Sequence, residues 1–282
     1  MKALLPIAVF LLMVSIGMSL RPSHLLQNWR RMIGGNGLRL LLATFIIPPA
    51  VALLLYHSLP LDFGEGVGLF MLGVVPGAPL VSRIAAKRGF DMQLAASYQV
   101  WGAVLVPVML PIVVYVSGRL YDRDVWISPL VLIKNIAENQ FAPLLIGLAF
   151  MHFVPVFSAR IQPAITVIGN VLLLVMIVAV LWVMRGELAA ITVWLLVASV
   201  LLAVASILAI TLLLHGTDAE TVKTLALCNA NRYVGLALLI TRQYTRARHA
   251  VPAIACYALI APMIMLIYAR LVRRRTALKA AT

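Results

Sequence analysis

Residues 221–241 read TVKTLALCNANRYVGLALLIT, an apolar stretch of membrane-spanning length that is interrupted at its centre. The interruption consists of polar or small residues, which are Asn229, Asn231, Arg232, Tyr233 and Gly235. Burying an arginine near the middle of a membrane costs at least about 2.5–3.5 kcal/mol, so its guanidinium must face a partner or a water-filled cavity. We therefore predict a broken helix here rather than an ordinary span.

A second interrupted stretch lies at residues 68–89, GLFMLGVVPGAPLVSRIAAKRG. Pro76, Gly77 and Pro79 fall near its middle, where the prolines remove backbone donors and loosen a helix. The alternative is a simple proline kink in a helix that packs normally. The matching break at 221–241 favours a pair of broken helices, which is typical of the midplane binding site of a secondary transporter.

The rest of the chain is typical of a membrane protein. Of its 282 residues 63% are hydrophobic and 11% charged, with a mean hydropathy of +1.03, whereas a soluble domain has about 45–50% apolar and about 25% charged residues. Apolar segments near the spanning length of roughly 20 residues recur throughout. They lie at about 3–20, 38–57, 64–87, 92–117, 127–154, 162–184, 189–215, 221–241 and 250–271. We predict an all-α polytopic membrane protein with about nine transmembrane helices, the first of them uncleaved.

The two broken segments are the third and the eighth in this series, so they cross the membrane in opposite senses. That arrangement is expected of two inverted repeats whose broken helices cross each other. We expect one integral membrane transporter domain over 1–282, with a truncated first repeat at 1–125 and a second repeat at 126–282.

The net charge of +14 is distributed in short links between apolar runs rather than on one face, which argues against nucleic acid as a partner. Placing the link at 21–38 in the cytoplasm puts fourteen basic residues inside and seven outside. Because lysine and arginine resist translocation, we expect an outside N-terminus and a cytoplasmic C-terminus in a bacterial inner membrane. The arginines between 242 and 248 argue the other way.

No pattern in the spans indicates an enzyme. The sequence has no nucleophile–base pair and no metal-binding motif there. Cys228 and Cys256 lie in apolar segments without metal-ligand spacing. We expect neither a cofactor nor a metal site.

Three stretches resemble the bile acid:sodium symporter family, within a wider superfamily of bile acid, arsenite and auxin-type carriers. VVPGAPLVSRIAAKRGFD at 74–91 and LCNANRYVGLALL at 227–239 resemble the two crossing helices of that family, and VSIGMSLRPSHL at 14–25 resembles a helix end and the loop after it. The resemblance implies a ten-helix fold of two inverted repeats, with a panel domain and a core domain that holds the crossed helices. Aligned on these stretches, this chain is expected to lack the first of those ten helices. The implied function is secondary active transport of a small organic solute by alternating access.

The sequence departs from the family at the residues that bind sodium. Aligning Gly235 with the family's glycine puts Cys228 at its sodium-binding glutamate and Arg232 at the glutamine beside it. A carboxylate is thereby lost and a cation is gained. The guanidinium of Arg232 could occupy the vacated cation site or could pair with an anionic substrate.

Other sodium ligands of the family are also replaced. Val81 and Ser82 stand where the family has serine and asparagine, and Gly102 and Ala103 stand where it has serine and threonine. A hard cation needs a shell of oxygen ligands, and most of those side chains are absent. We expect a transporter of a small, anionic organic solute that is not coupled to sodium at the usual sites; a proton or no coupling ion is favoured. A sodium-coupled symporter of the bile acid or organic anion type, or a channel or receptor on the same fold, is the alternative.

The candidate residues for binding solute or ion are Arg232, Asn229, Asn231, Tyr233, Cys228, Ser82, Gln99 and Ser97, and the candidate hinges are Pro76, Gly77, Pro79 and Gly235. Several have structural alternatives. The asparagines could cap a half-helix, Ser97 and Gln99 could bond neighbouring helices, and Arg232 could pair with Glu138. Lys134 and Glu138, four residues apart, are expected to pair with each other.

Overall fold

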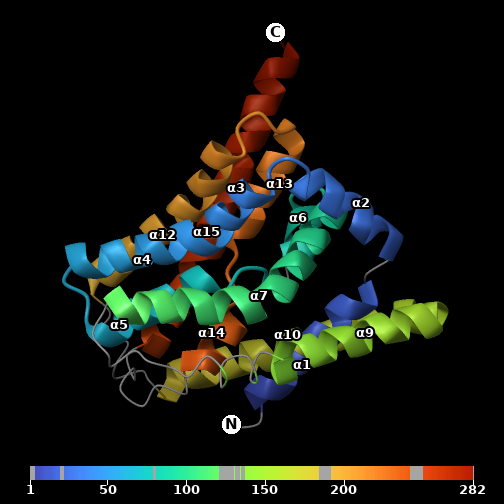
Figure 1. Ribbon diagram of the computed structural model, residues 1–282, viewed down its shortest axis with the longest axis horizontal. Coiled ribbons are helices and arrows are strands. Elements are labelled where there is room, and N and C mark those ends of the chain that lie inside the picture. Colours follow the sequence, from blue (N-terminus) through green and yellow to red (C-terminus); the bar gives the residue numbers. More distant parts are fainter. Residues whose placement is uncertain are drawn as a thin grey trace.

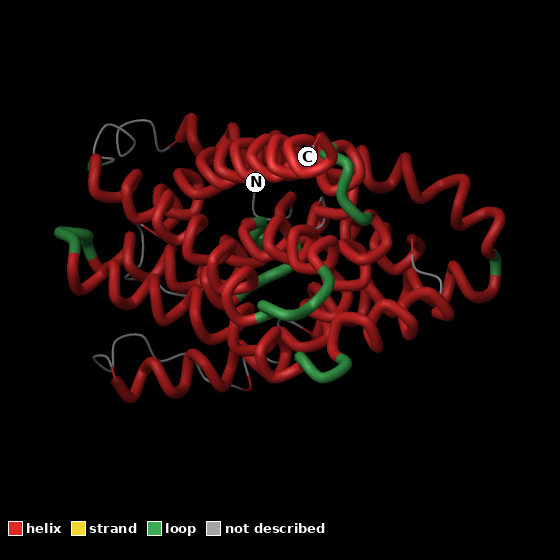
Figure 2. Tube along the Cα trace, turned by 90° about the horizontal axis from the view of Figure 1, so that it is seen from above, coloured by secondary structure: helices red, strands yellow, loops and turns green. Residues whose placement is uncertain are grey.

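The computed structural model describes residues 4–19, 22–78, 81–120, 137–183, 192–241 and 250–281, together with positions 130 and 134. Every regular element in these ranges is helical, which confirms the all-α prediction (Figure 2). Five helical stretches are long and apolar enough to cross a membrane, namely Gly37–Ser58, Met92–Val113, Pro155–Met176, Val193–Leu213 and Ala250–Arg274. Shorter apolar helices lie at Pro6–Ser19, Phe63–Val74 and Ala142–Phe153. The chain is a polytopic membrane protein.

With one exception, in the link between the first two spans, the helices of the first part follow the predicted segments. They are α1 (Leu4–Ser19), α2 (Pro22–Ile33), the continuous run of α3 (Gly37–Leu41), η1 (Leu42–Ile46) and α4 (Ile47–Ser58), then α5 (Phe63–Val74), α6 (Val81–Lys87) and α7 (Met92–Leu120). The later helices are η3 (Ala137–Phe141), α9 (Ala142–Phe153), α10 (Pro155–Val183), α12 (Val193–Leu213), α13 (Ala219–Ala230), α14 (Val234–Thr241) and α15 (Ala250–Ala281). The boundary expected between the repeats, at 125 and 126, lies outside the described residues.

One group of helices consists of α1, α9 and α10, which lie together along the lower side of Figure 1. Two glycines let α1 and α9 approach closely: a Cβ on Gly17 would lie 2.3 Å from the carbonyl oxygen of Leu144, and one on Gly147 would lie 2.1 Å from that of Val14. Small residues allow this close backbone packing in membranes. The remaining long helices pack mainly with one another, and the same hydrophobic core reaches the first group through residues such as Val9 and Leu144. This division fits the panel and core arrangement that the family resemblance implies.

The link between the first two spans contains α2, an amphipathic helix that the sequence analysis treated as a simple connection. Met32 is buried and Trp29 and Ile33 pack against the core, while Arg30 and Arg31 form its basic last turn. The indole of Trp29 donates to the carbonyl oxygen of Ser97 on α7 at 3.1 Å. The helix therefore lies against the core.

Candidate functional site

Two broken helices meet in the core, as the sequence predicts. The first is interrupted between α5 and α6, and the second between α13 and α14. The unwound segments bond to each other: the N–H of Tyr233 donates to the carbonyl oxygen of Val75 at 3.0 Å, and the N–H of Ala78 donates to that of Asn231 at 3.3 Å. Backbone groups that the breaks remove from helices must find partners in an apolar surrounding. Here each break supplies hydrogen-bond partners to the backbone groups of the other break.

The first break is shaped by proline and glycine. Pro76 has no N–H to continue α5, and Gly77 has φ of 79°, a conformation that only glycine adopts readily. The break rests on α7, because a Cβ on Gly77 would lie 3.3 Å from the carbonyl oxygen of Gln99. Pro79 lies outside the described residues. Gly235 sits inside α14, where a Cβ would lie 3.3 Å from Val9 of α1, so its position is also one of close packing.

Arg232 lies at the second break and is only 1% exposed. Its guanidinium is held by neutral oxygens from four different elements. Nη1 donates to the carbonyl oxygens of Thr44 and Gly73, both at 3.1 Å. Nη2 donates to Ser206 Oγ at 3.2 Å and to Asn229 Oδ1 at 3.1 Å, while Nε has no partner. The four Nη hydrogens of the arginine are therefore matched by four acceptors.

Within the part of the chain that the structure describes, no carboxylate forms an ion pair with Arg232. The structural alternative with Glu138 is wrong, because Glu138 Oε1 lies 4.0 Å from Lys134 Nζ and both side chains are exposed. The pairing of Lys134 with Glu138, which the sequence predicts, is confirmed. The charge of Arg232 is thus stabilised by hydrogen bonds to dipoles alone.

Asn229 organises this cluster. Its Oδ1 accepts from Arg232 and from the hydroxyl of Tyr98 at 2.9 Å. Its Nδ2 donates to the carbonyl oxygens of Ala43 at 3.0 Å and Ser206 at 2.7 Å. All four hydrogen-bonding positions of the amide are used. Asn229 therefore positions Arg232 and joins η1, α7, α12 and α13.

The other predicted residues divide into two groups. Gln99, Asn231 and Tyr233 are at the crossing, and Gln99 Nε2, Asn231 Nδ2 and the Tyr233 hydroxyl are buried without a hydrogen-bond partner. Ser97 is elsewhere: its hydroxyl accepts from Asn28 Nδ2 on α2 at 3.0 Å, which matches the helix–helix alternative. Two further candidates are Cys228, which is a fully buried free thiol, and Ser82, which is partly buried on α6.

Four residues around Arg232 were not among the candidates predicted from the sequence: Thr44, Gly73, Ser206 and Tyr257. Thr44 and Ser206 are hydroxyl residues within apolar spans, which is only a weak signal. Thr44 contributes through its backbone carbonyl, and Tyr257 donates to the carbonyl oxygen of Ala230 at 2.7 Å, next to the break. Neither contact depends on a pattern that the sequence displays.

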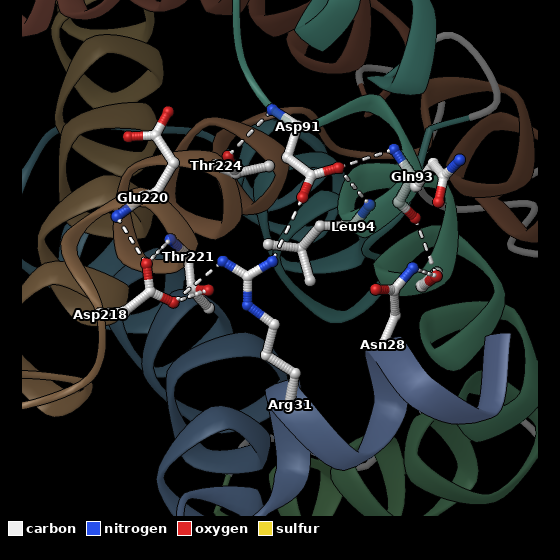
Figure 3. Close-up of polar contacts among 10 residues, drawn as sticks. Asn28, Arg31, Asp91, Gln93, Leu94, Asp218, Glu220, Thr221 and Thr224 are labelled. Atoms are coloured by element: carbon white, nitrogen blue, oxygen red, sulfur yellow. Dashed lines mark hydrogen bonds and ion pairs between the residues drawn. The ribbon is translucent and has the colours of Figure 1, made fainter. Parts of the chain in front are cut away.

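At the surface, one arginine of α2 joins the starts of two core helices (Figure 3). Arg31 Nη2 lies 3.1 Å from Asp218 Oδ2 at the start of α13, and Nη1 lies 3.4 Å from Asp91 Oδ2 before α7. Asp218 also accepts a hydrogen bond from the Thr221 hydroxyl, which is the main reason that its pKa is lowered to about 2. Backbone donation by Thr221 and the charge of Arg31 lower the pKa further, while partial burial opposes them.

Comparison with known families identifies a matching family model. Residues 6–191 match the model of the Sodium Bile acid symporter family. The matched region is about two thirds of the chain and includes the first broken helix, but it ends before α13. A search of curated proteins gave no match.

Proposed function

The chain belongs to the Sodium Bile acid symporter family, a family of solute transporters, and on that premise we propose that it carries a small organic anion by alternating access without sodium at the family's usual sites. We place it in a bacterial inner membrane with its C-terminus in the cytoplasm, as the distribution of basic residues favours. Transport is coupled to a proton or to no ion.

The observation that carries this proposal is the oxygen shell around Arg232. Four neutral oxygens surround its guanidinium at 3.1–3.2 Å, which is the kind of ligand set that a hard metal cation also takes. A guanidinium keeps its charge at every physiological pH. Arg232 therefore acts as a built-in cation that holds the acceptors together, where relatives bind an ion from solution.

The same geometry argues against Arg232 as the direct partner of the solute. Its four Nη hydrogens already have acceptors, and only Nε is left. The solute instead binds beside the crossing, where Gln99 Nε2, Asn231 Nδ2 and the Tyr233 hydroxyl lack acceptors. A carboxylate supplies such acceptors, and the N-terminal end of α14 adds positive partial charge.

Alternating access is supported by the two groups of helices. The crossed helices lie in the core, whereas α1, α9 and α10 form the other group. The groups meet near Gly235, where Val9 of α1 and Leu173 of α10 approach α14. Rocking one group against the other at this contact exposes the crossing first to one side of the membrane and then to the other.

The test is uptake of a panel of labelled organic anions into proteoliposomes, with and without a sodium gradient, for the wild type and Arg232→Ala. We expect saturable uptake by the wild type that is equal with and without the sodium gradient, and collapse of uptake in the variant. Uptake by the wild type that requires sodium would overturn the proposal even if the variant fails to fold. Uptake that rises in proportion to solute concentration without saturating would instead indicate a channel.

A further inference from the structure

A second cationic surface lies away from the crossing, where α6 ends beside α15. Its basic residues are Arg83, Lys87, Arg88, Arg270, Arg273 and Arg274. Among the described residues, none of them is within ion-pair distance of a carboxylate. The general preference for basic residues on the cytoplasmic side explains their presence in number. It does not explain why two of them are fixed in place.

Arg88 and Arg273 hold each other in a defined arrangement. Arg273 Nε donates to the carbonyl oxygen of Arg88 at 3.2 Å. Arg88 Nη2 donates to the carbonyl oxygen of Pro262 at 3.3 Å, so its side chain follows α15 towards the middle of that helix. Gly89, which follows Arg88, has φ of 75°. A Cβ on Gly89 would lie 3.2 Å from Nη2 of Arg273. The Arg273 guanidinium therefore lies beside the backbone of Arg88 and Gly89.

The arrangement leaves a donor without an acceptor. Arg88 Nη1 is buried and has no hydrogen-bond partner. An unsatisfied charged donor is costly, and a group of basic residues that has no carboxylate partner among the described residues attracts an anion. A phosphate group meets both needs, because it accepts several hydrogen bonds from arginine at once.

The surroundings identify where such a phosphate comes from. Pro262 belongs to the span Ala250–Arg274. Beside it, Met263, Leu266 and Ile267 are 64%, 40% and 51% exposed, which is expected of a surface that faces lipid. The exposed apolar strip is continuous with the arginines along α15. A ligand that fits both parts has an anionic head and an apolar tail.

We propose that Arg88 and Arg273 bind the phosphate group of an anionic membrane lipid, with its acyl chain along Met263, Leu266 and Ile267. This inference is independent of the transported solute and of Arg232. Helix α6 continues from the first break. In this proposal the bound lipid holds the end of α6 against α15.

The test compares binding of phosphatidylglycerol and phosphatidylcholine to the purified full-length protein by native mass spectrometry. The variants are Arg88→Gln and Arg273→Gln, and the matched control is Arg274→Gln, which removes an exposed arginine from the same helix. One arginine beside an anionic lipid contributes enough that its loss weakens binding about fivefold. We expect this loss in each test variant, less than a twofold change in the control, and partial rescue by Arg88→Lys.

A further arm uses glycerol 1-phosphate, the soluble headgroup alone. Because it lacks acyl chains, we expect no detectable binding at the lipid concentrations used. Binding as tight as that of phosphatidylglycerol would show a site for a soluble anion and overturn the lipid assignment. Equal binding of the two lipids by the wild type, or an equal loss in Arg274→Gln, would overturn the site itself. Uptake assays play no part, so failure here is distinguishable from failure of the proposed transport function.

Discussion

The N–H of Tyr233 donates to the carbonyl oxygen of Val75 at 3.0 Å, which joins the break in one helix to the break in the other. Arg232 directly precedes Tyr233, and one of its acceptors is Gly73, two residues before Val75. The crossing and the buried cation are therefore one structural unit. Any change that separates the two breaks also disturbs the guanidinium.

If Arg232 replaces a bound ion, then removing its charge should create a sodium site. We expect Arg232→Gln to unfold at a lower temperature than the wild type in choline chloride and to recover in sodium chloride. Sodium at ten times its dissociation constant would restore about 1.4 kcal/mol. The measurement is thermal unfolding in detergent in the two salts.

The control for this prediction is Arg232→Lys, which retains a positive charge and should not respond to sodium. A wild type that is stabilised by sodium as strongly as Arg232→Gln would contradict the ion-replacement idea. The two salts have equal ionic strength, so general screening affects all variants alike.

The left-handed conformation of Gly77 is expected to be essential for the first break. An alanine there adopts a φ of 79° at a cost of about 1–2 kcal/mol, and its Cβ would also lie 3.3 Å from the carbonyl oxygen of Gln99. Gly35→Ala is the matched control, since Gly35 has φ of 77° with no atom within 4 Å. We expect both variants to lose similar stability, but only Gly77→Ala to lose uptake in proteoliposomes. Equal uptake by the two would show that the position of this break is not critical.

Much of the fold could be predicted because membrane spans have a minimum apolar length. The two breaks were also predictable, since Pro76 and Gly77 cannot continue a regular helix and Arg232 cannot face lipid. Helix α2 was missed as an element because its polar and basic residues mark it only as a connection between spans.

The partners of Arg232 could not be predicted. Two of its four acceptors are the backbone carbonyls of Thr44 and Gly73, and every residue type carries such a carbonyl. Ser206 is 26 residues from Arg232 along the chain and lies in a uniformly apolar span. Long-range packing decides these contacts, so a local pattern contains no information about them.

The close contact between α1 and α9 should tolerate no side chain at Gly147. A Cβ there would lie 2.1 Å from the carbonyl oxygen of Val14, and a backbone atom cannot move aside without separating the helices. We expect Gly147→Ala to destabilise the protein by about 1–3 kcal/mol, as overpacking does. Gly169→Ala is the control, because its Cβ would meet the flexible side chain of Leu12 at 2.9 Å. An unfolding temperature that is lowered equally in Gly147→Ala and Gly169→Ala would contradict this explanation.

The start of α13 should make stability depend on acid pH through Asp218. Its carboxylate accepts from the backbone N–H groups of Glu220 and Thr221 at 3.0 and 3.1 Å and contacts Arg31 (Figure 3). The folded-state pKa is about 2, below the value of about 3.9 in an unfolded chain. A lowered pKa means that the stabilisation is complete above the unfolded value and is lost as the pH falls from about 4 to about 2.

Two substitutions separate the cap from the charge at this position. Asp218→Ala removes both and should cost about 1 kcal/mol at pH 7, whereas Asp218→Asn retains a good N-cap and should cost less. The difference in unfolding temperature between the wild type and Asp218→Ala should stay constant from pH 8 to pH 5 and shrink below pH 4, because the unfolded chain then binds a proton at Asp218 that the folded wild type does not. A difference that is still complete at pH 2 would mean that the neutral cap alone stabilises α13 and that the ion pair with Arg31 contributes nothing.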